Sequence, residues 1–454
     1  MKAIIIGAGQ VGRGLAETLC LENRDVVFID QDEERLKPIV EKLDLLTIEG
    51  NGASASVLAR ADVMNANLLL AVTNSVETNV LACQIAKMMN PSIRTICRIA
   101  VKDYFSETHG VNAERLGIDA AVVPHLECAK AIVNAVHQPA VREIAELSAP
   151  GAVICGFRLQ PGSPIVGCQI GKFPRPELIG RTRFAAISRR GRLIFPGDGE
   201  RFNNYDEVYA AGPRDEIEGL IDWSQTSMEK QPRRRAVIAG AGNVGLEVAL
   251  RLHALGWRVA VIEADRKVAE AALDALPAGI ELLQGTPTST QLMEELGVSG
   301  CRVFIAASRV DETNVLSCLL ARRLGAAKVI ALINKADYRA IIASMENIDC
   351  CFSPRIAALN TILNLVQGGE RRVGALLHRL QAEIFELTVD STSEAAGKNL
   401  VQLPLPEGCT LAARLRGNTI VSASNEEFNI ASDRVVLMGE APALRQAQKL
   451  FLAR

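Results

Sequence analysis

The chain has 454 residues, a formal net charge of −2, 48% hydrophobic residues and only 4% aromatic residues. This length is enough for about three or four domains with sizeable cores. The near-neutral charge and few aromatic side chains argue against nucleic-acid binding, since the basic block is the triplet Arg233-Arg234-Arg235 alone. No apolar run approaches the roughly 18 residues that a membrane span needs. Residues 1–20 already begin a fold, so we expect no signal peptide.

The chain opens with a short apolar run, then G-x-G-x-x-G at 7–12, then an amphipathic run. This order predicts a strand, a tight turn and a helix. Gly7 allows the turn, Gly9 lets a ligand approach the backbone, and Gly12 lets the helix pack close to the strand.

A buried strand, DVVFID, follows and ends at Asp30, 18 residues after Gly12. An acid at this position can accept hydrogen bonds from a ribose diol and repels a 2′-phosphate. The pattern therefore favours NAD(H) or a plain adenine nucleotide over NADP. The alternative is that Asp30 caps the next helix, in DQDEER.

Four more predicted strands, LLTI, LLLAV, TICRI and AAVV, alternate with helical runs and predict a doubly wound parallel sheet. Thr73 and Asn74 end the fourth of the six strands, at the edge where ligands bind, although they suit helix capping as well. Arg98 lies inside an apolar strand, so its charge must be paired. A phosphate or a local carboxylate would satisfy it, and we favour phosphate.

Short alternating strands with Gly/Pro turns follow and predict a small β-rich α+β domain at 142–222. The polar, Pro-containing stretch at 223–233 is the predicted linker. The first pattern then returns at 234–357, with Gly240, Gly242 and Gly245. Glu263 takes the place of Asp30, also 18 residues after the last glycine.

A second β-rich domain is predicted at 372–454, giving an A–B–A′–B′ order that suggests a pseudo-symmetric assembly instead of one catalytic cleft. The two copies differ in charge at two positions of the candidate ligand sites. Arg309 stands at the position of Asn74, and Leu332 at the position of Arg98. The two sites therefore cannot be electrostatically equal.

Catalytic groups are sparse. None of the five histidines lies in a metal motif, and the sequence has no G-x-S-x-G, H-E-x-x-H or P-loop. Asp103-Tyr104 and Asp337-Tyr338 recur, but a D-Y pair that starts a helix suits cap and core roles. The eleven scattered cysteines include no C-x-x-C and predict small core residues in a reducing cytosol. A nucleotide site without such chemistry suggests a sensor.

Two apolar helices follow the two predicted sheets, each starting near a proline. Each helix is expected to carry one apolar stripe, which a single Rossmann unit does not obviously need. The alternative is that the stripe packs only against its own chain and takes no part in assembly. The stripe residues are Ala129, Ile132, Val133 and Val136 in the first helix, and Ile356, Leu359, Leu363 and Val366 in the second.

Three features occur in both copies: the glycine fingerprint, the acid 18 residues later and the E-T-N stretch. The first copy also contains T-N-x-x-E-T-N and P-G-S-P-I-V-G. With these motifs the chain resembles the tandem RCK/KTN domains of peripheral subunits of bacterial Trk potassium-uptake systems. The resemblance covers essentially the whole chain. It implies RCK N-domains at 1–125 and 234–357, RCK C-domains at 142–222 and 372–454, and crossover helices at 126–141 and 358–371 that pair adjacent N-domains.

The resemblance also implies NAD(H) as the ligand, with ATP or ADP as further candidates, and no catalytic or metal-binding residues. It implies a homotetrameric ring on the cytoplasmic side of the inner membrane, docked on an integral-membrane potassium transporter or channel of the Trk pore type. The implied cofactor-binding residues are Gly7, Ala8, Gly9, Gln10, Val11, Gly12, Asp30, Thr73, Asn74, Arg98, Gly240, Ala241, Gly242, Asn243, Val244, Gly245, Glu263 and Ser308.

The second half departs from the family pattern, since P-G-S-P-I-V-G becomes TSEAAGKN at 392–399. Two other functions stay open. One is an NAD-dependent oxidoreductase, which would need a substrate domain with a His, Lys or Tyr acid. The other is the regulator of a different cation transporter.

Overall fold

The structure is a computed structural model in which the chain forms two compact units. The first unit is Met1–Ala131 with Phe352–Gly368, and the second is Ile132–Cys351 with Gly369–Arg454. The described residues are 1–21, 24–100, 112–137, 141–190, 192–224, 234–335, 338, 342, 347–367, 373–377, 382–399, 402–421 and 430–452. Several predictions lie outside them, namely those for Asp103, Tyr104 and Asp337, most of the linker, and the last residues of both crossover segments.

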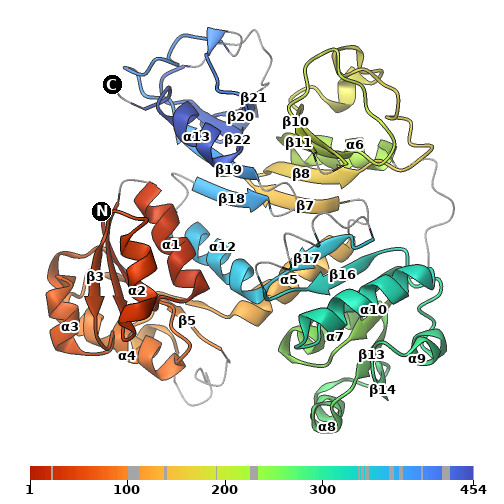
Figure 1. Ribbon diagram of the computed structural model, residues 1–454, viewed down its shortest axis with the longest axis horizontal. Helices are drawn as coiled ribbons and strands as arrows, with labels where there is room; N and C mark the ends of the chain where they lie inside the picture. The colour runs from red at the N-terminus through yellow and green to blue at the C-terminus, as the bar shows by residue number, and fades with distance from the viewer. Residues whose placement is uncertain are drawn as a thin grey trace. The chain divides into compact units, whose positions relative to one another are not determined.

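The first unit contains a six-stranded sheet in the order β3-β2-β1-β4-β5-β6, in which every neighbouring pair is parallel (Figure 1). The order reverses between β1 and β4, which is the position where ligands bind in doubly wound sheets. The strands are β1 (Lys2–Ile6), β2 (Asp25–Asp30), β3 (Leu46–Glu49), β4 (Leu68–Ala71), β5 (Arg94–Arg98) and β6 (Ala120–Val122). The helices are α1 (Gln10–Leu21), α2 (Glu33–Val40), α3 (Ala55–Arg60), α4 (Val76–Met89), the start of α5 (Pro124–His137) and α12 (Pro354–Gln367).

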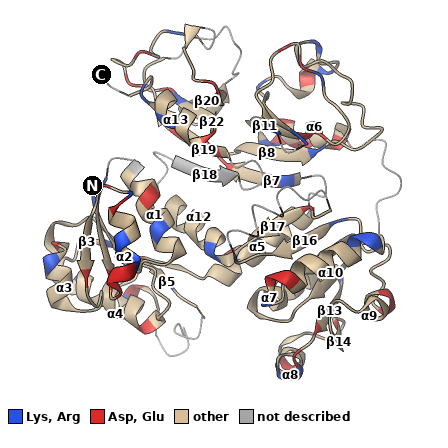
Figure 2. Ribbon diagram, viewed as in Figure 1, with Lys and Arg blue, Asp and Glu red and all other residues tan. Residues whose placement is uncertain are grey.

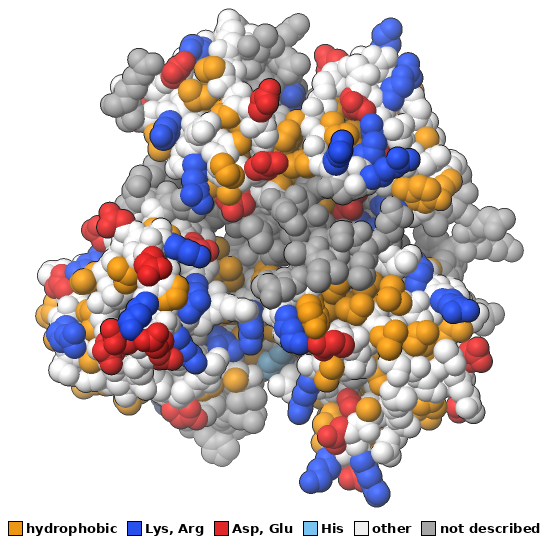
Figure 3. Space-filling model, viewed as in Figure 1, with side chains coloured by type: hydrophobic (Ala, Val, Ile, Leu, Met, Phe, Trp, Pro, Cys, Tyr) orange, Lys and Arg blue, Asp and Glu red, His pale blue; other side chains and the backbone are white. Residues whose placement is uncertain are grey.

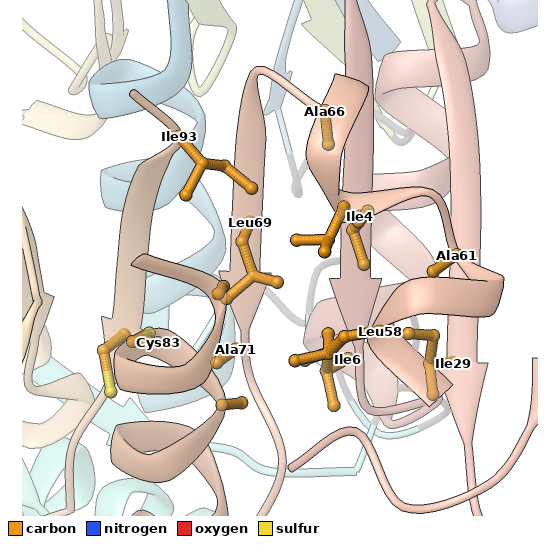
Figure 4. Packing of buried hydrophobic residues seen from close by; sticks show 14 of the residues in the cluster. Ile4, Ile6, Ile29, Leu58, Ala61, Ala66, Leu69, Ala71, Cys83 and Ile93 are labelled. Atoms are coloured by element: carbon orange, nitrogen blue, oxygen red, sulfur yellow. The ribbon is translucent and has the colours of Figure 1, made fainter. Parts of the chain in front are cut away.

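The strands of this sheet are apolar on both faces because helices cover both faces. Ile4 and Ile6 of β1 enter one core, whereas Ala3 and Ile5 enter the other, as the two-residue period of a strand requires. Figure 4 shows the first core, where Ile6 lies beside Leu58 of α3. The apolar runs thus determine which segments form strands.

Helix α12 belongs to the second half of the sequence but packs on α1 of the first unit. Its buried residues join the core that contains Ile5 and Leu15. A Cβ on Gly14 of α1 would lie 2.8 Å from Leu359 Cδ2, so this glycine permits the close approach of the two helices. The buried positions of α12 are Ala358, Ile362, Leu363 and Val366.

The predicted stripe on α12 is right for three of its four residues. Leu363 and Val366 are buried, and Leu359 is partly buried and packs against the same core, whereas Ile356 is only partly buried. Because α12 contacts both α1 and β6, Ala358 and Ile362 are buried as well. In α5, Ala129, Ile132, Val133 and Val136 are all buried, as predicted.

The second unit contains a second six-stranded sheet in the equivalent order, β14-β13-β12-β15-β16-β17, with parallel pairs from β14 to β16. Its strands are β12 (Arg235–Ala239), β13 (Arg258–Glu263), β14 (Glu281–Gln284), β15 (Val303–Ala306), β16 (Val329–Leu332) and β17 (Cys350–Phe352). Its helices are α7 (Asn243–Ala254), α8 (Arg266–Ala275), α9 (Thr290–Glu295) and α10 (Asp311–Arg323).

The end of α5 is fixed within this second unit by a buried lysine. Lys328 Nζ, just before β16, donates hydrogen bonds to the carbonyl oxygens of Ala135 (2.7 Å) and Val141 (2.9 Å). Burial lowers the pKa of Lys328. A cation at the carboxyl end of a helix satisfies carbonyl groups that have no partner within the helix.

Two antiparallel sheets of equal topology complete the second unit, β10-β9-β11-β8-β7 and β18-β19-β22-β20-β21. They share one core, to which both Ile154 and Met438 contribute. Their elements are β7 (Val141–Glu146), β8 (Ala152–Arg158), β9 (Arg183–Arg189), β10 (Arg192–Ile194), β11 (Glu207–Pro213), α6 (Arg214–Ser224), β18 (Val373–Leu377), β19 (Ala382–Thr388), β20 (Cys409–Arg416), β21 (Thr419–Val421), β22 (Arg434–Gly439) and α13 (Ala441–Gln448). The predicted fold class, two doubly wound parallel sheets each followed by a small β-rich domain, is confirmed.

Acidic and basic residues are interspersed along the helices of both units (Figure 2), and the side chains on the face in Figure 3 show the same mixture. All eleven cysteines are free, and eight of them are buried. No helix among the described residues is both long enough and apolar enough to cross a membrane.

Candidate functional site

The three glycines of the first turn have different surroundings. Gly7 has a φ of +111°, which favours glycine, and a Cβ there would also lie 2.9 Å from the amide nitrogen of Thr73. A Cβ on Gly12 would lie 1.9 Å from the carbonyl oxygen of Gly7. Among the described residues, a Cβ on Gly9 would meet no atom within 4 Å. Gly7 and Gly12 thus shape the turn, whereas Gly9 borders open space.

The second turn repeats this arrangement. Gly240 has a φ of +110°, and a Cβ on Gly245 would lie 1.9 Å from the Gly240 carbonyl oxygen. A Cβ on Gly242 would again meet no atom of the described part of the chain within 4 Å. Each turn begins a helix, α1 or α7, so its backbone N–H groups can bind an anion.

The acid at the end of β2 holds the glycine turn. Asp30 Oδ2 accepts a hydrogen bond from the amide of Ala8 (2.5 Å), and Oδ1 accepts one from Asp32 (3.0 Å). Glu263 does the same in the second unit, with the amides of Ala241 (2.6 Å) and Asp265 (2.9 Å).

The alternative role of Asp30 as a helix cap is wrong. The N-cap of α2 is Asp32, which accepts a hydrogen bond from the amide of Glu34. In the second unit, Asp265 is the N-cap of α8. Asp30 and Glu263 are therefore left at the strand tips, beside the turns.

The loop after β4 is held by a buried asparagine that the sequence reasoning missed. Asn79 Oδ1 accepts hydrogen bonds from the amide and hydroxyl of Thr73 (3.0 and 2.6 Å). Its Nδ2 donates to the carbonyl oxygen of Arg98 (2.9 Å) and so joins this loop to β5. The N-cap of α4 is Ser75, whose side-chain oxygen accepts a hydrogen bond from the amide of Thr78. The capping role considered for Thr73 and Asn74 is therefore wrong.

Asn314 makes the same connections in the second unit. Its Oδ1 accepts hydrogen bonds from the amide and hydroxyl of Ser308, and its Nδ2 donates to the carbonyl oxygen of Leu332 (2.8 Å). The E-T-N triplet, identical at 77–79 and 312–314, was the signal for this role.

Arg98 lies at the end of β5 and points its guanidinium toward the loop. Nη1 donates to the carbonyl oxygen of Thr73 (3.2 Å) and to Asn74 Oδ1 (3.0 Å). Burial lowers the pKa of Arg98, and the positive charge of Arg355 lowers it further. Within the described part of the chain no carboxylate forms an ion pair with Arg98, so the carboxylate alternative finds no support there.

Arg355 is the second residue that sequence reasoning missed. It is an exposed residue at the start of α12, and its Nη1 donates to Gln10 Oε1 (2.9 Å) in the first turn of α1. Gln10 and Arg355 lie 345 positions apart, so spacing could not reveal the contact.

The second site differs from the first in the charged residues around the loop that follows its fourth strand. The strand pairings Ala71–Cys97 and Ala306–Ala331 place Leu332 at the position of Arg98. Asp311, which is buried, accepts hydrogen bonds from the amides of Asn334 and Lys335.

Glu312 lies beside Asp311 and accepts from Lys335 Nζ (2.7 Å) and the Tyr338 hydroxyl (2.8 Å). The hydrogen bond from Lys335 is the main cause that lowers the pKa of Glu312 to about 2. Arg309 is exposed in the same loop. Among the residues that can be placed, no group of three His, Cys, Asp or Glu side chains could hold a metal ion.

The family model of the TrkA-N domain matches the chain twice, at residues 3–124 and 236–354. These two ranges contain the two parallel sheets except for the first residues of β1 and β12, and they cover more than half of the chain. The chain belongs to the TrkA family.

TrkA-family relatives match along nearly the full length. A "Trk system potassium uptake protein TrkA" from Halomonas elongata is 31% identical over 99% of this chain and 98% of its own. The protein of that name from Vibrio alginolyticus is 30% identical over all of both chains. A "TrkA homolog 1" from Methanosarcina mazei is 32% identical over 99% of this chain and 100% of its own.

Solved structures share the fold at lower identity. The "GsuK RCK domain" has a TM-score of 0.55 and 18% identity, and covers 100% of this TrkA-family chain and 95% of its own. The "GsuK channel bound to NAD" has a TM-score of 0.55 and 19% identity, and covers 100% of this chain and 79% of its own. At such identities the likeness shows the fold alone.

Proposed function

We propose that this chain is a cytosolic, non-enzymatic regulatory subunit of a potassium-uptake system. Its N-domains bind NAD(H) or adenine nucleotides, and the bound nucleotide changes the state of a membrane potassium-transporting partner. The proposal is supported by the name that full-length relatives share, "Trk system potassium uptake protein". It is also supported by two glycine turns, each with an acid at the neighbouring strand tip.

The observation that carries nucleotide binding is the open space above Gly9 and Gly242, next to backbone amides and an acid. In the proposal, the nucleotide phosphates bind the turns at 7–12 and 240–245, and the ribose binds Asp30 or Glu263. Thr73, Asn74 and Arg98 complete the first site, and Ser308 takes part in the second.

NAD(H) is the favoured ligand, with ATP or ADP as alternatives. The acid at the strand tip suits a ribose diol and disfavours a 2′-phosphate. One neighbour of the same fold is described as the "GsuK channel bound to NAD". We extend that ligand to this chain as part of the proposal.

The proposed partner is an integral-membrane potassium transporter of the Trk pore type, bound on the cytoplasmic side of the inner membrane. The proposed assembly is a homotetramer, and the proposed division of the chain is N–C–N–C. A nucleotide that binds two states of this assembly unequally shifts their populations, and the assembly passes that bias to the pore.

Calorimetry on the full chain tests nucleotide binding, with NADH, ADP and ATP as ligands. Co-purification with membrane partners, with and without each nucleotide, tests the partner. The proposal predicts saturable binding and a nucleotide-dependent yield of a potassium-transporting membrane protein. Failure of all three nucleotides to bind at millimolar concentration would contradict it.

A further inference from the structure

Helix α12 places a residue of the second half of the chain beside the first glycine turn. Arg355 lies in the first turn of α12 and donates to Gln10, which lies within the glycine motif at 7–12 and begins α1. Four buried apolar residues hold α12 on the first domain, and the hydroxyl of Thr361 donates to Glu127 Oε2 (3.2 Å). The backbone position of Arg355 is thus determined by packing, while its side chain stays exposed.

Burial lowers the pKa of Arg98, and the positive charge of the nearby Arg355 lowers it further, because the two charges repel. Their hydrogen-bond acceptors are uncharged, the Thr73 carbonyl, the Asn74 amide and the Gln10 amide. Among the residues that the structure describes, no carboxylate forms an ion pair with either guanidinium. The Arg98 guanidinium lies on the loop after β4 and the Arg355 guanidinium on the adjacent glycine turn, and two such cations without a counter-charge favour an anionic ligand.

We propose that Arg355 is a phosphate-binding residue of the first nucleotide site, contributed by the second half of the chain. The inference rests on the proposed function, because it assigns a further residue to the same site. A guanidinium is suited to phosphate oxygens, and its contribution grows with the charge of the ligand. Arg355 therefore favours ATP over NADH.

The consequence is a link between the two halves of the chain. Phosphate contact with Arg355 requires α12 to stay docked on α1, and α12 follows β17 of the second sheet. Ligand binding at the first site therefore favours the docked position of α12. Arg355 acts as a specificity residue and as a contact between the halves.

The test is calorimetry on the full chain with ATP and with NADH, in variants that leave only the first site free. Gly242→Val blocks the second turn, because its side chain enters the open space there. In this background we compare Arg355→Gln, Arg355→Lys and the control Arg94→Gln. Arg94 is an exposed arginine at the opposite end of the strand that carries Arg98.

We expect Arg355→Gln to weaken ATP binding about tenfold, with a smaller effect on NADH, since each charge-assisted hydrogen bond contributes most to the more highly charged ligand. Arg355→Lys keeps the positive charge, so this variant should keep part of the ATP affinity, and its ATP binding should still weaken as the salt concentration rises. The melting temperature without ligand should stay constant or rise, because a repulsive charge is removed. Arg94→Gln should change neither affinity.

An unchanged ATP affinity in Arg355→Gln would overturn the inference, as would an equal loss for both ligands together with a lowered melting temperature. Arg98→Gln separates this failure from failure of the proposed function. If Arg98→Gln weakens binding while Arg355→Gln does not, the nucleotide site stands and only Arg355 is excluded. If the parent chain binds neither ligand, the proposed function itself fails.

Discussion

The carboxylate of Asp30 accepts a hydrogen bond from the amide of Ala8 at 2.5 Å, in the middle of the glycine turn. Glu263 holds Ala241 in the same way at 2.6 Å. In our proposal the same carboxylates bind the ribose. The acid then has two roles, since it positions the turn and accepts hydrogen bonds from the ligand.

The first prediction concerns Asp30→Ala. The variant loses an acceptor for the turn and for the ribose, and hydrogen bonds to a charged group contribute about 1.5–3 kcal/mol each. We expect NADH affinity at the first site to fall by at least tenfold, measured by calorimetry in the Gly242→Val background. The full chain is required because α12 completes the core of the first unit. Unchanged affinity would remove Asp30 from the site.

The second prediction separates two glycines of one motif. Gly12→Ala places a Cβ 1.9 Å from a backbone oxygen, so we expect a strongly lowered melting temperature. Gly9→Val enters open space, so the melting temperature should stay near the parent value while nucleotide binding at the first site is lost. Thermal unfolding and calorimetry on the same samples measure both effects. In the Gly242→Val background, retained nucleotide binding by Gly9→Val would show that no ligand approaches this turn.

The third prediction concerns the difference between the two sites. With Gly242→Val only the first site is free, and with Gly9→Val only the second. Because Leu332 replaces Arg98, we expect the first site to rank ATP, ADP and NADH differently from the second. Arg98→Leu should bring the first ranking closer to the second. Identical rankings in the two single-site chains would count against this account.

The fourth prediction concerns α5. Ile132 and Val136 are 0% and 1% exposed within this single chain, so a charge there acts on the fold before it acts on assembly. We expect Ile132→Glu to lower the melting temperature by many degrees, because a buried charge without a partner is costly. A variant that keeps its melting temperature would show that α5 is not packed as described. The proposed tetramer is tested separately, by light scattering of the parent chain.

The twelve strands of the parallel sheets were predictable because apolar runs, turn glycines and periodicity act locally. The strand-tip acids and Arg98 followed from their places along those runs. The repeat also predicted that the sites differ, through Leu332 and Arg309. These are properties of short stretches of sequence.

The missed features depend on contacts between distant residues. Arg355 contacts Gln10 only because α12, although it belongs to the second half of the sequence, is part of the first unit. Asn79 belongs to the repeated E-T-N triplet, so the sequence marks it as a candidate. Its hydrogen bond to the backbone of Arg98, however, depends on how β4 and β5 are aligned in the sheet. The stripe on α12 omitted Ala358 and Ile362, because the sequence does not show that α12 contacts both α1 and β6.

Potassium uptake tests the central claim most directly. The full chain is expressed with the Trk membrane subunit of the same organism in a bacterial strain that lacks its own TrkA. Its uptake rate is compared with that of the Gly9→Val, Gly242→Val double variant, whose fold and loss of nucleotide binding are verified first. We expect the parent chain to support uptake and the double variant to fail. Equal uptake by the two chains would contradict the claim that nucleotide binding regulates transport.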